Sequence, residues 1–166
     1  ILQWLAVAAP PQLFRARRGR TAPLRLSTFL RCTGGFDGLL LGFRCDKLSE
    51  EGEVSGHISA AAPLLKDGAI SDGAVALLLD SLTGFALWAS GHVGFVSAEL
   101  NLKIQGNAFA GDQLIVKAWV KQAPTKPQDR RLREFAILAF ELRRAKHERE
   151  DSDILLAQGE QTMVCI

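Results

Sequence analysis

The sequence predicts an α+β protein in which an antiparallel sheet is wrapped around one long central helix. Residues 70–90 contain a run from Ala74 to Ala89 that is apolar on almost every side and exceeds the length of an ordinary strand, which is about 3–10 residues. A helix that is apolar all round is enclosed by other protein. The segments that flank it alternate in the manner of strands, two before the helix and four after it. This order favours one helix packed against a single sheet.

The predicted central helix spans residues 71–89, with Ser71 or Asp72 as its N-cap. Its apolar run, Ala74–Ala89, has sixteen residues and is shorter than the roughly 20 apolar residues that cross a bilayer, so we expect no transmembrane segment. Gly84 in its interior costs about 1 kcal/mol relative to alanine and suggests the close approach of another backbone. Asp80 lies too far into the helix to cap it, and burying its charge is costly unless the charge is paired or used. Asp80 is therefore a candidate functional residue.

Six segments have the pattern of strands. They span residues 39–48, 53–60, 95–105, 114–121, 133–143 and 154–166. The first two form a hairpin that turns near Gly52, and a loop over residues 63–68 leads to the helix. In the third segment the alternation places Ser97 on the polar face together with Glu99.

Residues 130–150 admit two interpretations. Their arginine, glutamate, leucine and alanine content favours a helix. The apolar residues Phe135, Ile137 and Ala139 alternate with other apolar residues, which instead favours a strand covered on both faces. We predict a strand to about Arg143, followed by a charged loop over residues 144–153.

The composition is that of one globular domain without a strongly charged partner. The 166 residues carry a net charge of +2, which gives little reason to expect nucleic acid or an anionic membrane as partner. The three cysteines are odd in number and far apart, which favours a reducing compartment over a disulfide framework. No histidine or cysteine spacing indicates a zinc site, and we expect neither a metal nor a cofactor.

Residues 1–37 differ from the rest of the chain. The first 36 residues contain six arginines and no acidic residue, a composition typical of mitochondrial or plastid targeting segments. We expect this stretch to be either a targeting remnant, which predicts a mitochondrial location, or an arm that docks on a neighbouring subunit. The folded domain is then residues 38–166.

Four segments resemble the hotdog-fold acyl-CoA thioesterases, in particular the small phenylacetate-pathway and thioesterase-superfamily type. Residues 68–84 resemble the family's helix motif, which begins G-x-x-H-G-G-x-x-A and continues with a leucine, an aspartate and a glycine, here Leu79, Asp80 and Gly84. Residues 95–102 resemble its next strand, 111–118 its G-D-x-L-x-x-x-A strand, and 155–162 its closing L-x-A-x-G-x-x-T strand. The resemblance covers residues 38–166 and implies the hotdog fold.

The resemblance also implies a catalytic pair. Asp80 falls where the family keeps its catalytic carboxylate, and Ser97 falls where a supporting hydroxyl often sits. Asp80 is then the base or the nucleophile that cleaves the thioester, and Ser97 orients the attacking water. In such folds the acyl-CoA lies at a dimer interface, so a second chain completes the site.

The oxyanion and substrate-binding positions implied by the family are Leu65, Asp72 and Gly73. Gly73 matches the second glycine of His-Gly-Gly, Ser71 replaces the histidine, and Asp72 replaces the first glycine. Some family members place asparagine or glutamine at the position of Leu65. The helix N-terminus still offers oriented N–H groups, but a carboxylate at Asp72 opposes the negative charge that an oxyanion site stabilises.

Two functions follow. The first is a hotdog thioesterase-like protein that hydrolyses, or at least binds, acyl-CoA-type or acyl-carrier thioesters. The alternative is a catalytically inactive hotdog subunit with a structural role in a larger mitochondrial assembly, docked through residues 1–37. Both imply a homo- or hetero-oligomer formed through the hotdog interface.

Overall fold

The computed structural model describes residues 42–61, 64–125, 133–147 and 151–166. The predicted extension over residues 1–37 and the domain boundary at residue 38 lie outside these ranges. The strands before the helix are β1 (Arg44–Leu48), β2 (Glu53–Ser59), β3 (Leu65–Lys66) and β4 (Ala69–Ile70). Helix α3 (Asp72–Ala89) is followed by β5 (Phe95–Ile104), β6 (Gln113–Gln122), β7 (Phe135–Arg144) and β8 (Ile154–Cys165).

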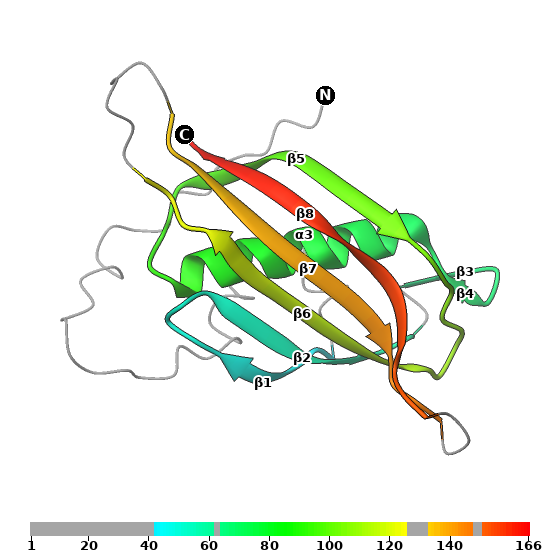
Figure 1. Cartoon of the computed structure of the whole chain (residues 1–166). Helices are drawn as coiled ribbons and strands as arrows, with labels where there is room; N and C mark the ends of the chain where they lie inside the picture. The colour runs from blue at the N-terminus through cyan, green and yellow to red at the C-terminus, as the bar shows by residue number, and fades with distance from the viewer. Residues whose placement is uncertain (1–41, 62–63, 126–132, 148–150) are drawn as a thin grey trace. The chain divides into compact units, whose positions relative to one another are not determined.

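The main sheet has the strand order β1-β2-β6-β7-β8-β5, and every neighbouring pair is antiparallel. Helix α3 lies across one face of this sheet (Figure 1). The predicted architecture, an antiparallel sheet wrapped around one helix, is confirmed. The hairpin of β1 and β2 and the four later strands lie where the alternation placed them, except that Gly42 and Phe43, within the first predicted strand, precede β1. Residues 135–144 are the central strand β7, so the strand interpretation of the ambiguous segment is correct.

Helix α3 begins at the predicted position. Ser71 is the N-cap, and its hydroxyl accepts a hydrogen bond from Ala74 N at 3.2 Å. By length and composition α3 also resembles a membrane span, with a mean hydropathy of 1.3, but half of its residues are buried in the protein. It packs on the sheet as a core helix does.

The core fills the space between α3 and the inner face of the sheet. From the sheet, β6 and β7 contribute the alternate residues that point toward the helix, and these are almost inaccessible to solvent. The largest enclosed side chains on these elements are Leu78, Leu79, Leu82, Phe85 and Leu87 of α3, and Leu114, Leu138, Phe140 and Leu142 of the sheet. Each such side chain contributes about 1.5–3 kcal/mol through burial.

The segment predicted as a loop over residues 63–68 is instead partly a small hairpin. Leu65 pairs with Ile70 and Lys66 with Ala69, and Asp67 and Gly68 form the turn with φ of 54° and 84°. Two residues with positive φ are typical of a tight hairpin turn, and Asp-Gly is a favoured sequence for it. Each strand has two residues, too few to show alternation, which is why the pattern missed them.

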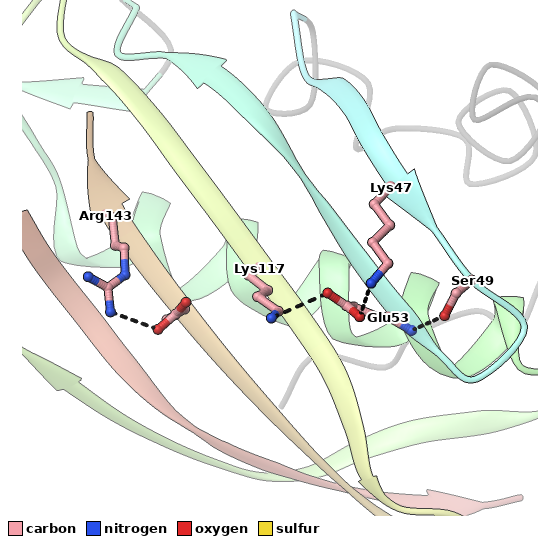
Figure 2. A network of polar contacts seen from close by, with 6 residues as sticks. Lys47, Ser49, Glu53, Lys117 and Arg143 are labelled. Carbon is pink, nitrogen blue, oxygen red and sulfur yellow. Dashed lines mark hydrogen bonds and ion pairs between the residues drawn. The ribbon is translucent and has the colours of Figure 1, made fainter. Parts of the chain in front are cut away.

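A polar network crosses the outer face of the sheet, away from α3. The carboxylate of Glu53 on β2 contacts Lys47 Nζ of β1 at 2.5 Å and Lys117 Nζ of β6 at 3.3 Å (Figure 2). Lys117 also lies over the ring of Trp119 at 5.4 Å from its centroid. One carboxylate therefore links three neighbouring strands.

Glu53 should make stability depend on pH. The hydrogen bond from Lys47, supported by Lys117, holds the pKa of the Glu53 carboxyl below its ordinary value of 4.5. A lowered folded-state pKa stabilises the fold above the ordinary value, and this stabilisation is lost as the pH falls through the folded-state pKa. We expect Glu53→Gln to lower the free energy of unfolding by about 0.2–1 kcal/mol near pH 7. Urea unfolding at several pH values measures this, and the difference from the unmodified protein should shrink below pH 4.5.

Glu99→Gln is the matched control, because Glu99 accepts a hydrogen bond from Asn101 and has no lysine partner among the described residues. A Glu53→Gln difference that stays constant through the acid range would contradict this role.

The glycines at 84 and 159 should respond oppositely to alanine. A Cβ at Gly84 would meet only Met163 Cε, at 3.9 Å, so the predicted close approach of a backbone is wrong within the described structure. A Cβ at Gly159 would lie 1.9 Å from the carbonyl oxygen of Asn101 and 2.8 Å from the ring of Phe140. We expect Gly84→Ala to stabilise by about 0.5–1 kcal/mol and Gly159→Ala to destabilise by about 1–3 kcal/mol. Thermal unfolding of both variants measures this, and a destabilised Gly84→Ala would contradict it.

Candidate functional site

Asp80 and Ser97, predicted as a pair, are in direct contact. Ser97 Oγ on β5 donates a hydrogen bond to Asp80 Oδ1 on α3 at 2.5 Å. Asp80 is half-buried, whereas Leu78, Leu79 and Leu82 on the same turns are enclosed in the core. The helix is held by its leucines, and its carboxylate faces the β5 side of the sheet.

A β-bulge in β5 turns Ser97 toward the helix. Ser97 pairs with Met163 and Glu99 pairs with Thr162, so Ala98 is an extra residue between two consecutive register positions. Met163 is buried on the inner face, and its cross-strand partner Ser97 shares that face. The alternation that placed Ser97 with Glu99 is therefore wrong, because a bulge re-aims the side chains on one side of it.

Gln161 on β8 completes the contact and was not predicted. Its side chain is fully buried, and Nε2 donates hydrogen bonds to Asp80 Oδ1 and to Ser97 Oγ, the latter at 2.7 Å. The signal was present in the sequence. Along β8 the inward positions are Ala157, Gly159, Gln161 and Met163, and the polar one among them has to find a partner.

Thr83 lies on the other side of Gln161. Its Oγ1 is fully buried and contacts Gln161 Oε1, and it also lies 3.0 Å from the carbonyl oxygen of Leu79 and 2.8 Å from that of Asp80. The chain from Thr83 through Gln161 to Asp80 and Ser97 joins α3 to two strands.

The network leaves one oxygen of Asp80 available. Both Ser97 and Gln161 donate to Oδ1, and no described residue donates to Oδ2. An anchored carboxylate with one unpartnered oxygen can accept a proton from water or attack a carbonyl carbon directly.

The other predicted site residues gather at the start of α3. Asp72 and Gly73 are exposed in the first turn, and Leu65 is half-buried in β3. Since Ser71 is the cap, the interpretation of Asp72 as an N-cap is wrong. Asp72 and Asp80 are eight residues apart on one helix, which corresponds to about 12 Å along its axis. Within one chain, the structure does not bring these positions to Asp80 and Ser97.

No metal centre is visible in the described part of the chain, where no group of three or more histidine, cysteine, aspartate or glutamate side chains could hold an ion. A shallow hollow of about 590 Å³ lies over β5 to β8 and includes Trp119, Lys103 and Glu160. Glu160 precedes Gln161 in β8, so the two side chains point to opposite faces. The hollow is thus separate from the Asp80 site.

The fold is similar to solved structures of thioesterases. Thioesterase superfamily member 2 from zebrafish is 20% identical, with a TM-score of 0.64 over 83% of this chain and 91% of that one. The mouse thioesterase superfamily member 2 is 19% identical, with a TM-score of 0.63 over 82% and 92%. A hypothetical thioesterase protein from Streptococcus pneumoniae, solved with coenzyme A, is 12% identical, with a TM-score of 0.61 over 76% and 87%.

No protein-family model matches the sequence, and no curated protein matches it either. The similarity is therefore one of fold. The chain is a hotdog-fold protein. Its fold is that of thioesterase superfamily members, as the sequence motifs predicted.

Proposed function

We propose that the protein binds and hydrolyses acyl-CoA-type thioesters, with Asp80 as the base or nucleophile. The observation that carries this proposal is the Asp80 carboxylate, which has one oxygen fixed by Ser97 and Gln161 and the other unpartnered among the described residues. The coenzyme A bound to the Streptococcus pneumoniae structure supports the choice of substrate class.

In the general-base route, Asp80 accepts a proton from water as the water oxygen attacks the thioester carbonyl carbon. The C–S bond then breaks, and the thiolate takes up a proton, which gives a carboxylic acid and a free thiol. Ser97 differs here from the role expected of it. Its one hydroxyl proton is donated to Asp80 Oδ1, so Ser97 orients the carboxylate and not the attacking water.

The carbonyl oxygen needs donors that Asp80's own helix terminus cannot supply, because that terminus is about 12 Å away along the axis. We propose that the N-terminus of α3 in a second copy supplies them. Strand β5, which carries Ser97, has β8 as its one neighbour among the described strands. A second copy that pairs along β5 extends the sheet and brings another helix terminus to the site.

One observation favours the alternative, an inactive structural subunit. Asp72 is exposed in the first turn of α3, where its charge opposes a developing oxyanion. In that case residues 1–37 dock the domain into a larger, mitochondrial assembly and Asp80 is retained for its contacts with Ser97 and Gln161. Two experiments separate the functions.

The first experiment removes the carboxylate. We expect the unmodified protein to release free CoA from medium- or long-chain acyl-CoA, and Asp80→Asn to lower kcat by about 10²–10⁴-fold, as is usual for the loss of a general base. A thiol assay of released CoA measures both. Asp151→Asn, in an exposed loop, is the control and should retain full turnover. A loss of tenfold or less in Asp80→Asn, on the same scale, would show that Asp80 is not the base, and no turnover in the unmodified protein would favour the structural subunit.

The second experiment removes the charge at position 72. If the helix terminus holds the thioester oxygen, Asp72→Asn should raise kcat, because the opposing charge is gone; an oxyanion donor is worth about 10²–10³-fold elsewhere. The same variant should lose about 0.3–1 kcal/mol of stability, since an acidic residue in the first turn complements the helix dipole. Turnover and melting temperature are measured on the same sample. Unchanged turnover in an active enzyme would refute the role given to Asp72.

A further inference from the structure

We infer that Thr83 and Gln161 form a positioning pair for the hydrolytic carboxylate. The hydroxyl proton of Thr83 anchors Oε1 of the Gln161 side-chain amide, and Nε2 of the same amide holds Asp80 and Ser97. The inference rests on the proposed function, because positioning matters only where Asp80 acts.

Both amide protons of Gln161 have an acceptor. The amide nitrogen has two protons and two acceptors, Asp80 Oδ1 and Ser97 Oγ. Ser97 then has one proton of its own, which it donates to Asp80 Oδ1. Each donor has one acceptor, and the anchored oxygen of Asp80 receives two hydrogen bonds.

Thr83 satisfies the oxygen end of the amide. Its hydroxyl has one proton and three acceptors within reach, the carbonyl oxygens of Leu79 and Asp80 and the Oε1 of Gln161. The two carbonyls belong to the interior of α3, where helix geometry gives each a backbone N–H donor four residues on. Among the described residues, Thr83 is the one donor to the buried Oε1. The proton is therefore directed to Gln161.

The opposite amide orientation fails at Asp80. If the amide turned over, Oε1 would face the Asp80 carboxylate, and two acceptors cannot bond to each other. Nε2 would then face Thr83, and Asp80 would lose its donor from β8. The Asp80 carboxylate thus selects this orientation, and the hydroxyl of Thr83 supports it by donating to the buried Oε1.

Packing alone does not require a polar residue at this position. The inward neighbours of Gln161 along β8 are Gly159 and Met163, and methionine has nearly the volume of glutamine. A buried amide in an apolar layer carries a desolvation cost that methionine avoids. The hydrogen bonds from Gln161 to Asp80 and Ser97 explain why a polar residue occupies this position.

The experiment measures kcat and KM separately for Gln161→Met, Thr83→Val, Thr83→Ser and the double variant Thr83→Val with Gln161→Met. Valine has the shape of threonine without its hydroxyl, and serine keeps the hydroxyl. Thr162→Val, which faces outward on β8, is the matched control. All assays are run well below each variant's melting temperature, so that lost stability does not lower the rate.

We expect Gln161→Met and Thr83→Val to lower kcat by at least about tenfold, since displacement of a reacting group by about 1 Å can cost 10²-fold. KM should change by no more than about twofold, because the thioester is not bound through these residues. Thr83→Ser should restore kcat to within about twofold of the unmodified protein, and the double variant should be no slower than Gln161→Met alone.

The outcomes separate this inference from the proposed function. If the unmodified protein is active and Gln161→Met has normal turnover, the positioning role of Thr83 and Gln161 is wrong, whereas the proposed hydrolase function stands. Additive losses in the double variant overturn the positioning role also, because Thr83 would then act independently of Gln161. If Gln161→Met does not fold, the comparison of Thr83→Val with Thr83→Ser decides on its own, and equal rates overturn the pair. No turnover in the unmodified protein overturns both proposals.

Discussion

The central helix α3 is packed against the sheet, yet it carries the carboxylate of Asp80. The structure depends on stabilising this charge. An anion at the edge of an apolar core is stable only when donors replace the water that it loses. The chain provides them from two strands distant in sequence, with Ser97 on β5 and Gln161 on β8 both directed at one oxygen of Asp80. These hydrogen bonds hold the helix to β8 and β5 at one edge of the sheet, while the buried leucines of the helix pack on the central strands.

The sheet order makes this arrangement possible. Strand β8 lies between the central strand β7 and the edge strand β5, so its inner face is still covered by the helix while β5 lies near the open side. Gln161 therefore holds the carboxylate from the buried side, on β8, and solvent or substrate can approach it beside the exposed Ser97, on β5. On the opposite face of the sheet, Glu53 and its two lysines form a separate network that concerns stability and not the site.

The fold could be predicted from the sequence, but the site only in part. The apolar helix and the alternating strands are dictated by burial, which leaves a regular pattern, and the Asp80 and Ser97 positions came from the family motif. Gln161 was missed because a single polar residue in an otherwise alternating strand resembles a solvent-facing one. The orientation of Ser97 could not be read because a bulge leaves no mark in the alternation; it is visible only in the pairing of β5 with β8.

The bulge at Ala98 divides β5 into two parts, and the alternation of inward and outward side chains shifts by one residue between them. Before Ala98 the odd-numbered residues Phe95 and Ser97 face the helix, and after it the even-numbered residues Leu100 and Leu102 do. A homologous sequence that lacked one residue here would align well by eye and yet present a different side chain to Asp80. Gap placement in residues 95–100, more than residue identity, is therefore what comparison of this protein with distant relatives has to resolve.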